Sequence, residues 1–129
     1  MVTFVPPKKV QRRAGKARPV FPAPPALTLV AAAYQPGEWV RLTFDRAVDV
    51  ASADTAAVRV DDGAVAGWLF RGDGPAALVG PRTVQVGLAI LDRPAGSGTR
   101  LSAGAGTGIV AADDGGAWPG VTDLSLPFP

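Results

Sequence analysis

Two pairs of adjacent carboxylates are the side chains in this sequence best suited to metal binding or acid–base chemistry. Asp61-Asp62 and Asp113-Asp114 each stand directly before a glycine. Neighbouring acids can hold Ca²⁺ through their oxygens, and two carboxylates can carry out glycoside hydrolysis. Neither pair has the D-x-D-x-D-G frame of a calcium loop, and Asp followed by Gly is typical of a tight turn. We therefore predict turns at both pairs, with a calcium site or a catalytic pair as alternatives.

The other residue types used in catalysis are missing or lack the required spacing. The chain has no cysteine and no histidine, which excludes thiol nucleophiles, disulfides, Cys/His zinc sites and Ser-His-Asp triads. The glycine-rich run at residues 96–108 fits neither G-x-G-x-x-G nor a G-K-[ST] phosphate loop, and its glycines indicate turns and bulges. We predict a protein that is not an enzyme and that uses no metal and no cofactor.

Basic residues gather near the N-terminus. Residues 1–18 hold six of the 13 lysines and arginines and none of the 11 acids, so the remaining residues carry seven bases against 11 acids. Six prolines lie in residues 1–25, and proline favours extended backbone and removes amide donors. We predict a basic, proline-rich extended arm over residues 1–25, followed by one domain over residues 26–129.

The arm has the residue types of a segment that contacts other proteins. Its cations and apolar anchors are the candidate partner-binding residues: Phe4, Lys8, Lys9, Val10, Arg12, Arg13, Lys16, Arg18, Val20 and Phe21. We expect the cations to face acids on neighbouring chains, because a block of like charge is typical of an interaction tail. A solvated tail and a nucleic-acid-binding arm are the alternatives, although no aromatic residue lies among the cations to stack on bases.

The pattern that must position these residues is that of a β-sheet. Residues 38–45 and 83–90 alternate apolar and polar side chains, which predicts two strands with Val40, Leu42 and Phe44, and then Val84, Val86, Leu88 and Ile90, facing the core. Turn residues at 35–37, 62–63, 72–75 and 92–98 separate further candidate strands at 27–34, 57–61, 64–70, 100–103, 108–111 and 121–126. The spacing predicts an all-β fold, an antiparallel β-sandwich of about seven strands.

The sequence predicts on which face of the sheet two of the three tryptophans lie. Trp39 lies opposite the inward set of its strand, so it is either an interface anchor or part of a face covered by a loop or by the arm. Trp68 stands beside Leu69-Phe70 in a returning strand, and we predict that it lies in the core.

The domain resembles a known family in two segments. Residues 40–49 (VRLTFDRAVD) are similar to the "itltFsepvd" signature of bacterial Ig-like domains of the S-layer SbsA and Big_5 type. Residues 109–120 (IVAADDGGAWPG) resemble the family's I-x-D-x-x-G-N segment, with Gly116 in the place of the usual Asn. The resemblance covers residues 27–126 and implies an Ig-like sandwich that is a structural or adhesive module without catalytic residues.

The setting of the domain departs from that family, whose members usually occur in tandem in exported surface proteins. This chain has one such domain, a Met before its basic arm and no apolar run long enough for a signal peptide or a membrane span. With a single Ig-like domain, a basic arm and no signal peptide, the chain resembles accessory virion proteins of tailed phages.

We therefore expect a structural protein of a phage virion: a capsid decoration, head-completion or tail-associated subunit, made in the host cytoplasm. Its expected partners are other virion proteins or copies of itself in a symmetric assembly, with no membrane. The alternatives are a bacterial Ig-like adhesion or carbohydrate-binding module and a small nucleic-acid-binding protein that uses the arm.

Overall fold

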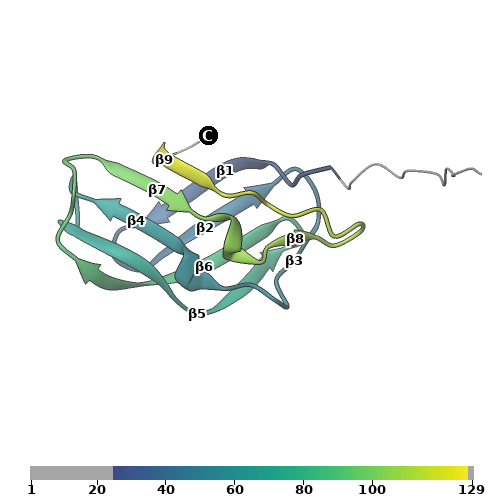
Figure 1. Cartoon of the computed structure of the whole chain (residues 1–129). Helices are drawn as coiled ribbons and strands as arrows, with labels where there is room; N and C mark the ends of the chain where they lie inside the picture. Colours follow the sequence, from purple (N-terminus) through teal and green to yellow (C-terminus); the bar gives the residue numbers. More distant parts are fainter. Residues whose placement is uncertain (1–24, 128–129) are drawn as a thin grey trace, which may run out of the picture.

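The computed structural model describes residues 25–127. The predicted arm, with all ten of its candidate partner-binding residues from Phe4 to Phe21, lies outside the described residues apart from Pro25. The described chain folds into nine strands and two single 3-10 turns, η1 (Thr55–Ala57) and η2 (Ala105–Thr107). The strands, drawn in Figure 1, are β1 (Leu29–Gln35), β2 (Trp39–Phe44), β3 (Val48–Asp49), β4 (Val58–Asp62), β5 (Trp68–Gly80), β6 (Thr83–Asp92), β7 (Thr99–Ala103), β8 (Val110–Ala111) and β9 (Val121–Ser125).

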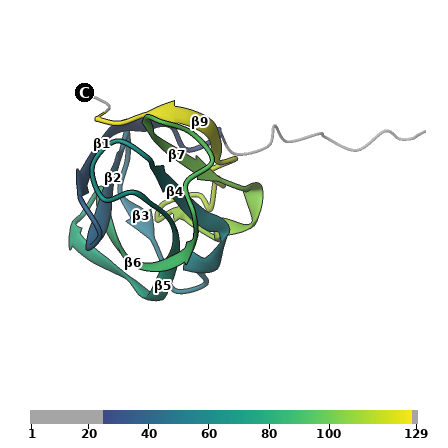
Figure 2. The same ribbon diagram turned by 90° about the vertical axis from the view of Figure 1, so that its left-hand side faces the viewer.

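Seven of these strands form one antiparallel sheet in the order β1-β2-β6-β5-β4-β7-β9, and β3 pairs with β8 in a small second sheet. The large sheet curls until its two edge strands, β1 and β9, reach the same side of the molecule, which Figure 2 shows from one end. The curl creates two layers, β1-β2-β6-β5 and β4-β7-β9. This is the strand order of the seven-stranded immunoglobulin arrangement, so the prediction of an all-β, Ig-like antiparallel sandwich is confirmed. Membership of the bacterial family stays a prediction.

The long strand β5 joins the two layers. Its first residues pair with β4, while the whole strand runs beside β6 with a shift in register between Asp73 and Ala77. The glycines and proline at 72–75, which predicted a break, therefore lie within a strand. Gly72 is needed there because a Cβ would collide with the carbonyl oxygen of Thr55 in η1. The expected strand end is wrong because glycine also permits a close approach of backbones.

The core confirms the alternation in β2 and in the first half of β6. Val40, Leu42 and Phe44 are fully buried, and so are Val84 and Val86. Val58, Val60 and Leu101 close the core from the other layer. Phe44 meets the ring of Trp118 edge to face, with 5.2 Å between the ring centroids, an arrangement that aromatic pairs favour.

Two apolar residues predicted to face the core are exposed at the end of the sheet. Ile90 is 57% exposed, because β2 pairs with β6 only as far as Gly87 and β6 continues beside β5 alone. Trp68 is 40% exposed, so its assignment to the core is wrong. It is the first residue of β5, and a turn at residues 63–66 occupies most of the predicted beginning of that strand. Alternation places a side chain on one face, but only a covering layer buries it.

Candidate binding surface

The outer face of the β1-β2-β6-β5 layer carries Trp39, the residue of the domain that the sequence offered as an interface anchor. Trp39 and Arg41 both point outward, because Val40 between them and Leu42 after them are buried. Along one row across the sheet, Trp39 pairs with Gly87 and Gly87 with Asp73. Along the next row, Arg41 pairs with Gln85 and Gln85 with Ala77.

Arg41 is held in one position above the tryptophan. Its guanidinium carbon lies 4.2 Å from the centroid of the Trp39 ring, and its Nε donates a hydrogen bond of 2.8 Å to Oε1 of Gln85. Its two η nitrogens make no hydrogen bond or ion pair within the described part of the chain. A stacked guanidinium with donors to spare is suited to binding a carboxylate.

Three small residues lie near this pair on the same face. Ala33 on β1 pairs with Arg41, Gly87 on β6 pairs with Trp39, and Ala77 on β5 lies beyond Gln85 in the row of Arg41. The neighbour of Trp39 on β1 is the longer Gln35. We call Trp39, Arg41, Gln85 and these three small residues the Trp39–Arg41 surface. Trp39 is half-buried, and the group stacked on its ring is Arg41 rather than a loop. Its role as an interface anchor stays a prediction.

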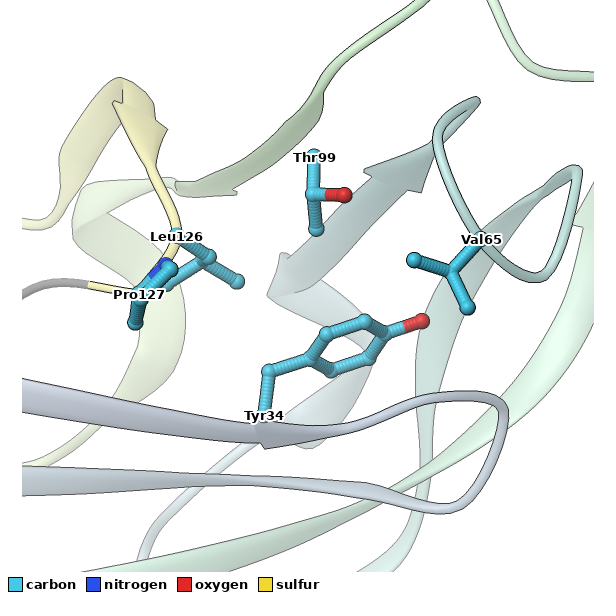
Figure 3. Close-up of a pocket in the computed structure, with 5 residues that line it drawn as sticks. All are labelled: Tyr34, Val65, Thr99, Leu126 and Pro127. Carbon is cyan, nitrogen blue, oxygen red and sulfur yellow. The ribbon is translucent and has the colours of Figure 1, made fainter.

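A pocket of about 220 Å³ opens at the other side of the sandwich, where β1 approaches the end of β9. Figure 3 shows its five lining residues: Tyr34, Val65, Thr99, Leu126 and Pro127. None of them is charged, and both hydroxyl groups donate hydrogen bonds to Asp62. The pocket therefore offers apolar walls and few polar groups for recognising a ligand.

Asp62 is a buried carboxylate that ties three parts of the fold together. Its oxygens accept hydrogen bonds from the hydroxyls of Tyr34 on β1, at 2.7 Å, and Thr99 on β7, at 3.0 Å. They also accept the amides of residues 64, 65 and 66, which shape the turn after β4. The sequence predicted only the turn, since nothing in the spacing shows that Tyr34 and Thr99 meet this carboxylate.

The hydrogen bonds decide the charge state of this cluster. Burial acts to raise the pKa of Asp62, but the donors Tyr34, Val65, Ala66 and Thr99 outweigh it and hold the pKa below its usual value. The pKa of Tyr34 is raised, by burial and then by its bond to the carboxylate. Asp62 is therefore an anion and Tyr34 a neutral donor at neutral pH, an arrangement suited to holding the fold together.

The remaining acidic residues singled out by the sequence also hold loops. Asp61 accepts the amides of Ala95 and Gly96, each at 3.1 Å, and so shapes the loop before β7. Among residues 25–127, no group of three or more acidic side chains gathers as a metal site would need. The amide bonds to Asp62 confirm the predicted turn after this pair, whereas Asp61 lies in β4 and holds a loop that is distant in the sequence.

Asp113 and Asp114 face a cation supplied by the chain itself. Arg46 Nη1 lies 2.8 Å from Asp114 and 3.4 Å from Asp113, and Nη2 donates to the carbonyl of Pro25 at 2.6 Å. The amide of Gly116 and then Arg46 lower the pKa of Asp114. The pair forms the predicted turn. The guanidinium of Arg46 balances the negative charge of the two carboxylates, a role that the calcium alternative gave to a metal ion.

Replacing Arg46 with glutamine is expected to lower the free energy of unfolding modestly, because three partly exposed charge-assisted contacts are lost together. Thermal or urea unfolding measures the change, which should shrink at high salt. Arg100→Gln is the matched control, since Arg100 is exposed and makes no side-chain hydrogen bond within residues 25–127. Equal effects of the two substitutions would contradict the assignment.

No helix in the described residues is long and apolar enough to cross a membrane. No protein-family model matches this chain, and searches of curated proteins and of solved structures return no match.

Proposed function

We propose that this chain is a non-enzymatic structural protein that docks to other proteins, as an accessory subunit of a phage virion. The observation that carries the proposal is the Trp39–Arg41 surface. Tryptophan and arginine are the residue types most enriched at the energetic centres of protein interfaces. Here both lie on a rigid sheet face, and Arg41 is already fixed by Trp39 and Gln85, which reduces the side-chain entropy lost on binding.

The same geometry favours a protein partner over a carbohydrate. A sugar ring would stack on an open aromatic face, whereas the guanidinium of Arg41 covers the Trp39 ring at 4.2 Å. The exposed group is therefore a cation whose η nitrogens have no partner in the described range 25–127, and such a group matches a carboxylate on a protein surface. This observation ranks the structural role above the carbohydrate-binding alternative.

The basic arm supplies a second contact in this proposal. Its six cations and the excess of acids in the rest of the chain suit contacts between an arm and the body of a neighbouring subunit. Two weak contacts on one chain, repeated by symmetry, bind far more tightly than either alone. The virion setting is taken from the resemblance of a single Ig-like domain with a basic arm to phage accessory proteins.

The proposal is tested by locating the chain in the organism that makes it. An epitope-tagged copy should co-sediment with purified virions, and a Trp39→Ala/Arg41→Ala variant should lose at least about tenfold in occupancy, as expected for hot-spot residues. Circular dichroism shows whether the variant is folded. Recovery of the chain in the cell envelope would favour the adhesion alternative. Retention on DNA that weakens steeply with salt would favour the nucleic-acid alternative.

A further inference from the structure

We propose that the Trp39–Arg41 surface, together with Asp73 beside it on β5, binds the same face of a second copy of this chain, with Arg41 paired to Asp73 of the partner subunit. The inference deepens the proposed function by naming a partner for the docking face. It is carried by a cation and an anion on either side of β6 on one sheet face, each with a charged group that has no ion-pair partner among residues 25–127.

The two charges lie at matching positions across β6. Arg41 is on β2 and Asp73 on β5, so each is one strand away from β6, or about 5 Å to either side of it. Asp73 shares a row with Gly87 and Trp39. Although the backbone of Arg41 lies in the next row, its guanidinium leans over Trp39 and so reaches the row of Asp73.

A two-fold axis along β6 would bring these charges together. The rotation places the β2 side of one copy over the β5 side of the other, so that each Arg41 faces Asp73 of the partner subunit. The interface is then self-complementary and contains the ion pair twice, as an isologous dimer requires. Gly87 lies on the axis and Ala77 beside it, and both are small enough for the two sheet faces to approach.

The charges are free to form this contact. Asp73 is exposed, and its carboxylate makes no hydrogen bond or ion pair with any other residue from 25 to 127. The η nitrogens of Arg41 are equally without a partner in that range. Trp39 supplies the apolar area next to each pair, which strengthens it by excluding water. A contact centred on one tryptophan and one ion pair from each copy gives a weak dimer. Repetition of this contact in a symmetric assembly strengthens the binding.

The test measures self-association of the full-length chain by sedimentation equilibrium up to about 1 mM, where weak complexes are detected. Arg41→Asp and Asp73→Arg each place like charges together twice, so each should raise the dimer dissociation constant at least about tenfold. The double variant Arg41→Asp/Asp73→Arg restores opposite charges and should return the constant to within about fivefold of the wild-type value. Arg100→Asp, on the other layer, should leave it unchanged.

A wild-type chain that stays monomeric at these concentrations would overturn the inference, and so would a double variant as weak as the single ones. Circular dichroism of each variant separates loss of folding from loss of association. A monomeric chain that still co-sediments with virions would refute only the dimer. A dimer that responds to the charge exchange but never joins particles would refute the virion role and leave the interface in place.

Discussion

The Asp62→Ala variant is expected to lose about 3–5 kcal/mol of unfolding free energy. The carboxylate is fully buried and accepts five hydrogen bonds, two from hydroxyls and three from amides. Its removal leaves the hydroxyl of Tyr34 on β1 and the amides of the turn after β4 without their acceptor. Urea unfolding of the variant and the wild type measures the loss.

Two further substitutions separate the buried carboxylate from its surroundings. Asp61→Ala removes two hydrogen bonds from an exposed loop and should cost about 1 kcal/mol. Tyr34→Phe removes one donor to Asp62 while the other four remain, and it should cost about 1–2 kcal/mol. If Asp62→Ala were no more damaging than Asp61→Ala, the network would not be what holds this end of the sandwich.

The same network predicts how stability depends on pH. The pKa of Asp62 is lower in the folded chain than the value of about 3.9 that an unfolded aspartate has. Its contribution is therefore complete above that unfolded pKa and is lost as the pH falls through the folded pKa. The difference in stability between wild type and Asp62→Asn should be constant near neutral pH and narrow below about pH 4. A constant difference down to pH 2 would contradict the lowered pKa.

Replacing Trp118 with alanine is expected to cost about 3–5 kcal/mol, because it leaves a large cavity in a closed core. Trp118 is only 2% exposed, packs edge to face on Phe44 and donates its amide to the carbonyl of Ile109. Thermal unfolding followed by circular dichroism measures the loss. Burial of this ring also predicts that its fluorescence shifts to longer wavelength on unfolding.

The other two tryptophans are the controls for this prediction. Trp68 is 40% exposed at the start of β5, and Trp39 stands half-buried on the outer face. Each alanine substitution should cost about 1 kcal/mol or less, as is usual away from the core. Trp39→Ala should instead weaken association, which separates a binding residue from a core residue. A loss of stability at Trp39 as large as that at Trp118 would show that its ring is structural.

Much of the fold follows from local patterns in the sequence. The alternation at 38–45 predicted the buried face of β2, because side chains in a strand point to opposite faces in turn. Gln35, Pro36 and Gly37 predicted the turn to the next strand, and Gly37 does adopt φ of +74° there, with a hydrogen bond from the Glu38 amide to the Gln35 carbonyl. These features depend on neighbours a few residues apart, so the sequence contains all the information they need.

The predictions of which side chains are buried are wrong where burial depends on an element distant in the sequence. Ile90 continues the alternation of Val84 and Val86, yet it is exposed because β2 does not extend that far along β6. Trp68 has apolar neighbours in sequence, but it begins a strand at the end of the sheet. In β1, a register shift near Val30 changes which residues face inward, and a period of two does not reveal such a shift.

The all-β class, the turns next to Asp62 and at Asp113-Asp114, and the outward direction of Trp39 all follow from local sequence patterns. The contacts that these residues make depend on the folded chain. Arg46 lies 67 positions from Asp113, Thr99 lies 37 from Asp62, and Gln85 lies 44 from Arg41. Side-chain direction along a strand follows from backbone geometry over two residues, whereas a buried carboxylate or a fixed guanidinium needs partners that the curl of the whole sheet brings together.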